Sequence, residues 1–212
     1  VGDSVDARRH LKRSMNHVGA ARGDPQAQHD LAIDLFNGHA PEVKDVRRAT
    51  DIPVKTLPSR IEGLEKPAAD VAVLTLRLPA TEMFQFHAGQ YVDILLKDGK
   101  RRSFSIANPP HDAATIELHV RHVPGGLFTD QVFSTMKVRD ILRFNGPHGS
   151  FYLRESDKPM ILLAGGTGFA PIKSIVLETL HLELQRPMHI YWGARDRAGL
   201  YQYEVAEAWA AQ

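Results

Sequence analysis

The sequence contains no cysteine among its 212 residues. This absence excludes disulfide bonds, thiolate nucleophiles, zinc sites with cysteine ligands and all-cysteine iron–sulfur clusters within these residues. We therefore predict no iron–sulfur cluster in this chain.

An excess of charge and long hydrophobic runs are also absent. The 26 lysines and arginines nearly balance the 25 aspartates and glutamates, which leaves a net charge of +1. Proteins that bind nucleic acid usually carry a strong basic patch, which this balance does not indicate. No apolar run reaches the length of a membrane span, and the first residues contain no apolar signal core. We expect a soluble, cytoplasmic protein without a nucleic-acid partner or a membrane span.

The patterns of hydrolases and metal sites are missing as well. The sequence shows neither a nucleophile elbow nor the paired carboxylates of acid–base hydrolysis. Among the 11 histidines, His119 and His122 form the one close pair of interest. Their spacing of three places them on opposite faces of a strand, so they cannot bind one ion together. We therefore predict no metal site.

Three segments differ in their patterns. Residues 1–50 are polar and lack strand-like alternation, and Asp24, Pro25 and Gly38 are typical helix boundary residues around a short apolar face. We predict a helical or partly disordered N-terminal extension there.

Residues 51–157 contain short strand patterns separated by turn residues. Strands are predicted at 54–66, 71–78, 90–96, 101–107, 115–122, 140–147 and 150–153, with a short helix at 125–136. This spacing is typical of a small antiparallel barrel.

Residues 158–212 alternate between strand and helix. Continuous apolar strands are predicted at 159–166 and 188–194, and helices at 170–184 and from 203 onward. Such alternation indicates a parallel sheet. The predicted fold class is therefore mixed, with a six-stranded β-barrel followed by an incomplete α/β domain.

The strongest motif is "LLAGGTGFAPI", residues 162–172. A buried strand ends in Gly165, Gly166, Thr167 and Gly168, and a helix is predicted to begin at about Pro171. Glycines allow a ligand to approach the backbone, and a helix N-terminus offers free N–H groups with positive dipole character. The motif predicts a pyrophosphate site, although a glycine-rich turn that binds nothing is the alternative. The stretch "PGGLFT", residues 124–129, is a weaker second phosphate candidate, because a hairpin that ends in a helix cap has the same pattern.

The stretch "RRSFSIAN", residues 101–108, places polar groups on a strand. Alternation sets Arg102 and Phe104 on one face and Ser103 and Ser105 on the other. A guanidinium, two hydroxyls and a flat ring suggest a polar or anionic guest, whereas an exposed strand of mixed composition is the alternative.

These motifs together resemble the ferredoxin–NADP reductase superfamily, and more narrowly the oxygenase-type and CDP-6-deoxy-glucoseen reductase-like flavin reductases. The resemblance covers residues 51–212 and rests on five motifs in order: "RRSFSIAN", "PGGLFT", "GPHGSF", "AGGTGFAPI" and "YWGARDRAGLY". It implies a flavin-dependent reductase in which nicotinamide gives a hydride to flavin N5 and the protein supplies position and electrostatics.

The resemblance also implies roles for individual residues. Arg102 would pair with the flavin pyrophosphate, Phe104 would stack on the isoalloxazine ring, and Ser105, the candidate catalytic residue, would hydrogen-bond near N5. The remaining flavin-binding candidates are Ser103, His119, Val120, Arg121, Gly125, Gly126, Leu127 and Thr129. The candidates for the nicotinamide dinucleotide are Gly166, Thr167, Gly168 and Pro171, with Gly193, Ala194 and Arg195 near its adenosine end.

The sequence departs from this family in three ways. Oxygenase-reductase relatives carry a cysteine-ligated [2Fe–2S] domain, so we expect any such relay to be on another chain or missing from this one. The sequence stops after two strand–helix units, from which we expect a fragment, a chain completed by a partner, or a degenerate protein. Arg139 stands where relatives usually have glycine, and we expect a local adjustment there without loss of fold.

Two functions stay open at this stage. The first is an NAD(P)H-dependent flavoprotein reductase that passes electrons to an acceptor protein, free flavin or quinone. The second is a flavin-binding or interaction protein without a competent nicotinamide site. Family habit favours FAD over FMN, and the donor is either NADH or NADPH.

Overall fold

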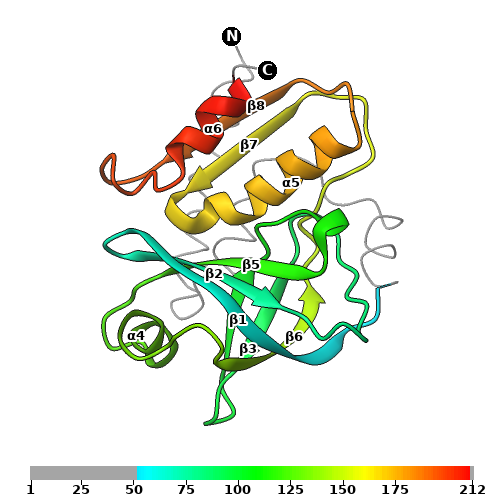
Figure 1. Ribbon diagram of the computed structural model, residues 1–212. Coiled ribbons are helices and arrows are strands. Elements are labelled where there is room, and N and C mark those ends of the chain that lie inside the picture. The colour runs from blue at the N-terminus through cyan, green and yellow to red at the C-terminus, as the bar shows by residue number, and fades with distance from the viewer. Residues whose placement is uncertain (1–51, 211–212) are drawn as a thin grey trace, which may run out of the picture. The chain divides into compact units, whose positions relative to one another are not determined.

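The structure is a computed structural model that describes residues 52–210. The predicted N-terminal extension lies outside these residues. Six antiparallel strands form the first part of the described chain (Figure 1). They are β1 (Lys55–Ala68), β2 (Val71–Arg77), β3 (Tyr91–Leu95), β4 (Arg101–Ser105), β5 (Thr115–Arg121) and β6 (Ile141–His148).

The six strands close into a barrel. They are ordered β4-β3-β6-β1-β2-β5, and a bridge between Ile106 and Leu118 connects the two edges. Alternation along β5 directs Leu118 and its neighbours two residues away into the interior, where Leu118 is fully buried. The helix α4 (Leu127–Ser134) contributes Phe128 and Val132 to the same core. The predicted antiparallel barrel is confirmed.

The predicted strand at 150–153 is wrong. Gly149 adopts a φ of +94° and turns the chain directly after β6. Beyond this turn one backbone hydrogen bond, from Leu153 N to Ala88 O at 3.0 Å, attaches the segment to the rest of the described chain. Phe151 and Leu153 pack against the core of the following α/β part instead of extending the barrel. Their apolar character therefore reflects tertiary packing.

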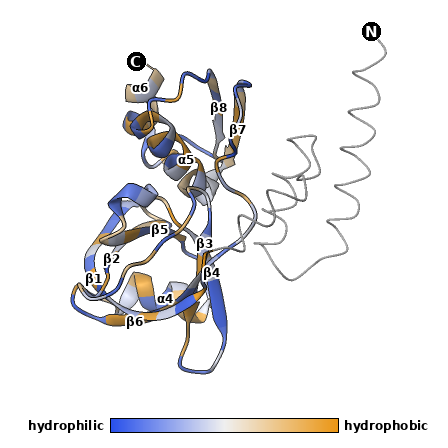
Figure 2. Ribbon diagram, turned by 90° about the vertical axis from the view of Figure 1, so that its right-hand side faces the viewer, coloured by the Kyte–Doolittle hydropathy of each residue, from blue (hydrophilic) through white to orange (hydrophobic). Residues whose placement is uncertain are grey.

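The second part of the described chain is residues 160–210, named the nucleotide half after the dinucleotide site that the sequence predicts in it. Its strands β7 (Met160–Gly165) and β8 (Met188–Gly193) are parallel. A 3₁₀ turn η2 (Gly166–Gly168) leads directly into α5 (Phe169–His181), so the helix begins two residues before Pro171. The helix α6 (Tyr203–Ala210) packs with α5 on the same side of the two-stranded sheet (Figure 2). The predicted parallel sheet is confirmed, and with it the mixed fold class.

The turn at Arg139 leaves the barrel fold intact and has a backbone conformation that glycine favours. Arg139 adopts a φ of +82°, the left-handed conformation that favours glycine, and its backbone N–H donates to Ile61 O at 2.8 Å. The turn before β6 therefore keeps a glycine-like backbone with an arginine in it.

Candidate functional site

The barrel has an open seam between its two edge strands, β4 and β5. Within residues 52–210 the Ile106–Leu118 bridge is the one pairing between these strands. Edge strands present N–H and C=O groups without ladder partners, which a planar ligand with a polar rim can bond. The predicted flavin residues 102–105 lie on one side of this seam, and the predicted residues 119–121 lie on the other side.

Strand β4 has the alternation that the sequence predicts. Arg102 pairs with Ile94 and Phe104 pairs with Val92, so both lie on the side of the barrel core. The Phe104 ring is half-buried, and its centroid lies 5.3 Å from that of Phe128 at the start of α4. Arg102 is exposed, and its Nη1 donates to the carbonyl of Arg101 at 2.7 Å. A phosphate oxygen can replace the Arg101 carbonyl as the acceptor for this guanidinium.

Ser103 and Ser105 lie on the opposite face of β4. The Ser103 hydroxyl donates to Asp93 Oδ1 at 2.7 Å, so this side chain is engaged within the barrel wall. Ser105 is half-buried next to the Ile106 bridge, at the end of the seam. Of the two hydroxyls, Ser105 is the better placed for a ligand in the seam.

The "PGGLFT" turn begins α4 and depends on both glycines. Gly125 has a φ of +80°, and a Cβ there would meet no atom within 4 Å. A Cβ on Gly126 would lie 2.6 Å from Thr129 Oγ1. The Thr129 hydroxyl donates to Val123 O at 2.9 Å, and no side chain caps the helix N-terminus. Thr129 therefore shapes the turn, while the open space at Gly125 and the exposed Leu127 border the uncapped end.

The glycine-rich ends of β7 and β8 form a second open site. Gly165 and Gly193 are register partners at the carboxyl ends of these parallel strands, and a Cβ on either would meet no atom within 4 Å. Ligands of open α/β sheets bind at this end of the strands. The predicted residues Thr167 and Gly168 are half-buried in η2, Pro171 is buried in α5, and Ala194 and Arg195 are exposed after β8.

A buried polar network connects the barrel with the nucleotide half. His119 on β5 has a relative exposure of 4%. Its Nε2 lies 2.6 Å from Glu117 Oε1, and its Nδ1 lies 2.6 Å from the Tyr201 hydroxyl. Lys173 of α5 donates to the same Glu117 oxygen at 2.7 Å. Two strand residues of the barrel thus contact two side chains of the nucleotide half.

The pKa shifts of the network residues indicate which of them carry a proton. Burial lowers the pKa of His119, and burial raises the pKa of Tyr201. Burial alone would raise the pKa of Glu117, but the hydrogen bond from His119 and the charge of Lys173 outweigh it and lower this pKa to about 2. His119 is therefore neutral, donates from Nε2 to the Glu117 carboxylate, and accepts from the Tyr201 O–H at Nδ1.

Three members of this network were not among the predicted site residues: Glu117, Lys173 and Tyr201. Glu117, His119 and Arg121 alternate with the buried Ile116, Leu118 and Val120 along β5. This period of two indicates a second, polar face that needs partners. The partners themselves come from far along the chain, since Tyr201 and His119 are separated by 82 positions.

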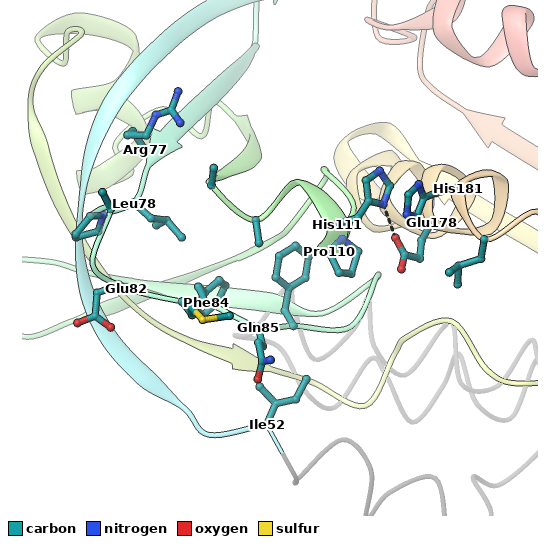
Figure 3. A pocket seen from close by; sticks show the side chains of 17 residues that line it. Ile52, Arg77, Leu78, Glu82, Phe84, Gln85, Pro110, His111, Glu178 and His181 are labelled. Atoms are coloured by element: carbon teal, nitrogen blue, oxygen red, sulfur yellow. Dashed lines mark hydrogen bonds and ion pairs between the residues drawn. The ribbon is translucent and has the colours of Figure 1, made fainter.

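A cavity of about 910 Å³ lies elsewhere on the molecule (Figure 3). It is lined by the β2–β3 connection, η1 (Pro110–Asp112) and the C-terminal end of α5. At its wall His111 contacts Glu178 at 2.8 Å and stacks on His181 with a centroid distance of 3.6 Å. None of the predicted site residues lines this cavity, so it is separate from both open sites.

Two family models match the chain in the same order as the two open sites. The oxidoreductase FAD-binding domain matches residues 59–152, and the oxidoreductase NAD-binding domain matches residues 162–212. The first match contains both strands of the seam, and the second contains the glycine-rich ends of β7 and β8.

Among proteins of known name, the chain is 40% identical over 185 residues to the CDP-6-deoxy-L-threo-D-glycero-4-hexulose-3-dehydrase reductase of Yersinia pseudotuberculosis. That alignment covers 87% of this chain and 53% of the relative. The chain is also 47% identical over 143 residues to a terephthalate 1,2-dioxygenase reductase component of Comamonas, covering 67% of this chain and 42% of the relative. The chain thus spans about half the length of these relatives.

Solved structures show the same fold. The cytochrome P450 reductase GcoB of Amycolatopsis superposes with a TM-score of 0.68 at 35% identity, covering 74% of this chain and 49% of that one. Phthalate dioxygenase reductase superposes with a TM-score of 0.66 at 24% identity, covering 74% of this chain and 50% of that one. The matched domains, the relatives and the shared fold agree, and the chain belongs to the ferredoxin reductase-like superfamily.

Proposed function

We propose that the chain binds FAD in the β4–β5 seam and NADH or NADPH at the glycine-rich ends of β7 and β8, and that it works as a flavoprotein reductase. The observation that carries this proposal is the adjacency of the two open sites. A Cβ on Gly166, in the turn after β7, would lie 3.0 Å from the guanidinium of Arg121 at the end of β5. A ligand in the seam and a ligand at the turn would therefore be neighbours.

The residues around the seam suit a flavin. The unpaired strand edges offer hydrogen bonds to a ring system, and the ring of Phe104 offers a flat apolar surface. The exposed Arg102 and the uncapped N-terminus of α4 offer positive charge and N–H groups to a pyrophosphate. Gly125, without a side chain, leaves room for the phosphates beside that terminus.

The residues after β7 suit a dinucleotide. Backbone N–H groups of the turn and the start of α5 can hold phosphates, and the absence of side chains at Gly165 and Gly193 lets the ligand approach both strand ends. Arg195 and the neighbouring Asp196 are exposed after β8, where they suit a 2′-phosphate and a 2′-hydroxyl respectively. Both donors therefore remain within the proposal.

When bound, the flavin supplies the redox chemistry by accepting two electrons from the nicotinamide and releasing them singly or together. The chain itself orients the two ligands and shields them from water. Phe104 holds the ring plane, Ser105 offers its hydroxyl at the end of the seam, and the buried His119 on the outer face of β5 keeps water out of the contact between the barrel and the nucleotide half. Positioning of this kind accounts for a large part of the rate in reactions between two bound ligands.

The domain organisation and the partner belong to the same proposal. We assign flavin binding to residues 51–157 and pyridine-nucleotide binding to residues 158–212. The Comamonas relative named above is the reductase component of a dioxygenase, which supports an electron-acceptor protein as the partner. No helix among residues 52–210 is long and apolar enough to cross a bilayer.

The test is an anaerobic visible spectrum of the purified, FAD-reconstituted protein before and after addition of NADH, and then of NADPH. Bleaching of the oxidised flavin band by one nucleotide is the expected result, and it identifies the donor. A band that persists with both nucleotides but bleaches with dithionite would contradict the reductase proposal and favour a flavin-binding protein.

A further inference from the structure

The outer face of β5 points toward the nucleotide half rather than toward solvent. Glu117, His119 and Arg121 alternate along this face. Glu117 contacts Lys173, His119 contacts Tyr201, and Arg121 lies against Gly166. Successive side chains of one strand thus contact three different segments of the nucleotide half.

A continuous path leads from His119 to the glycine-rich turn. The Tyr201 hydroxyl donates to His119 at 2.6 Å, and the Tyr201 ring stands edge-on to Trp192 with centroids 5.4 Å apart. Trp192 stacks on Phe169 at 3.8 Å with an interplanar angle of 7°. Its indole Nε1 donates to Gly166 O at 2.9 Å. Tyr201 therefore supports the side chain that fixes the first residue of the turn.

The turn is held from its other side by Arg121. Gly166 has a φ of +52°, and the Arg121 guanidinium occupies the position next to its Cα, where a Cβ would lie 3.0 Å away. The Arg121 Nε lies 3.5 Å from Asp70 Oδ2, an ion pair that is not a hydrogen bond. The turn thus lies between Trp192 of its own half and Arg121 of the barrel.

We propose that His119 and Tyr201 are positioning residues for the pyridine nucleotide, which set the Gly166–Gly168 turn against the barrel through Trp192. This inference rests on the proposed function, because it assigns the nucleotide to that turn. It differs from the family-based expectation for His119 and Arg121, because their side chains serve the nucleotide half and leave only their backbone to the flavin seam.

Three single substitutions test separately the two hydrogen bonds of His119, one with Tyr201 and one with Glu117. Tyr201→Phe removes the hydroxyl and keeps the ring against Trp192. His119→Gln keeps a nitrogen donor near the position of Nε2 for Glu117 but removes the acceptor for Tyr201. His119→Asn is the matched control, because its amide oxygen lies near the position of Nδ1 and can still accept from Tyr201.

The main readout is the dissociation constant of NAD⁺, measured by isothermal titration of the FAD-loaded protein, where no turnover occurs. Loss of one buried hydrogen bond predicts binding weaker by about 5- to 10-fold in Tyr201→Phe and His119→Gln. His119→Asn is expected to stay within about 2-fold of the wild type, as is retention of FAD in all three variants. The KM for NADH should rise by the same factor as the dissociation constant of NAD⁺, with kcat less affected.

Unchanged NAD⁺ binding in Tyr201→Phe would overturn the proposal, and so would equal losses of NAD⁺ and FAD binding, since a general loss of structure affects both cofactors. His119→Asn behaving like His119→Gln would also contradict it. If the wild type binds NAD⁺ without flavin reduction, the reductase function fails while the ranking of the variants still decides the positioning role. A wild type that binds no NAD⁺ overturns both.

Discussion

The barrel and the nucleotide half bury their apolar residues in different ways. The barrel closes on itself, so residues such as Leu74, Leu118 and Phe144 have no exposed area. Among residues 52–210, α5 and α6 cover one face of the sheet of the nucleotide half. On its other face Ile161 and Tyr191 are 55% and 58% exposed.

This difference indicates which contacts stabilise the folded structure of each part. A closed barrel supplies its own core, whereas parallel sheets are normally covered on both faces. The nucleotide half is fixed by apolar contacts with Ala88, Phe151 and Leu153 and by polar contacts with the barrel. Besides the Glu117–Lys173 and His119–Tyr201 contacts, the Ser174 hydroxyl donates to Asn108 O at 2.8 Å. We therefore expect the nucleotide half to depend on the barrel more than the barrel depends on the nucleotide half.

The largest expected effect comes from two core phenylalanines, one in each part. Phe144→Ala removes a fully buried ring that packs edge-on against Phe84 at 5.2 Å, and it should cost about 3–5 kcal/mol of unfolding free energy. We expect protection from hydrogen exchange to fall in both parts. Phe169→Ala, at an equally buried position against Trp192, should remove protection from β7 and β8 while β2 and β5 stay protected. Equal loss of protection in both parts with Phe169→Ala would break the comparison.

The contact between the two parts should weaken in acid. The pKa of His119 is lowered from 6.5, so below that pH the unfolded chain binds a proton that the folded chain does not. The pKa of Glu117 is lowered from 4.5 to about 2, so the same holds between these values. Stability should therefore fall as the pH drops below 6.5, fall more steeply below 4.5, and lose a few kcal/mol in total (on the order of 3 from Glu117).

Urea unfolding between pH 7 and pH 3 measures this effect. Glu117→Gln keeps an acceptor for His119 but cannot titrate, so its stability should vary less between pH 4.5 and pH 3 than that of the wild type. A wild-type curve that is flat below pH 4.5 would contradict the assignment of the network.

Two adjacent arginines test the barrel side of the comparison. Arg102→Ala should weaken FAD binding by about 10- to 100-fold, because a charge-assisted hydrogen bond contributes roughly 1.5–3 kcal/mol. The spectrum of bound flavin should hardly change, since this side chain is assigned to the phosphates. Arg101→Ala is the matched control, because Arg101 lies on the opposite face of β4, 3.8 Å from Asp93. Equal effects of the two variants on the dissociation constant of FAD would refute the assignment.

The smallest expected effect concerns the backbone before β6. Arg139→Gly should raise the free energy of unfolding by about 0.5–1 kcal/mol, because the φ of +82° is strained for arginine and relaxed for glycine. Val138→Gly, in the same turn but without a positive φ, should lower it. The urea midpoints of the two variants should therefore shift in opposite directions, and a shared direction would show that the strain is absent.

The strands, the parallel pair and the two glycine-rich turns were predictable because each depends on local pattern. Alternation along 115–121 and the turn glycines act over a few residues. The segment 150–153 misled the prediction, because Phe151 and Leu153 are apolar for the core of another part. Periodicity shows that a face is buried without showing which neighbour buries it.

The residues of the candidate site also fall into two groups: those with a local sequence pattern and those whose partner is distant in sequence. Arg102, Phe104 and Ser105 were predicted from one strand and a family resemblance. Tyr201 was not assigned, because its partner His119 lies 82 positions away and no local pattern records that distance. Even for His119, the sequence indicated a polar face of β5 but not that this face meets the nucleotide half.

The strand order of the barrel has a consequence for synthesis on the ribosome. β6 is the last of the six strands to be made, yet it lies between β3 and β1 in the middle of the sheet. Until residue 148 has emerged, the Ile106–Leu118 bridge is the one strand pairing that can join β1–β2–β5 to β3–β4 within the described barrel, and the edges next to β6 stay exposed. β6 is therefore the strand that joins β3 to β1, and Tyr201 is synthesised only after all six strands of the barrel.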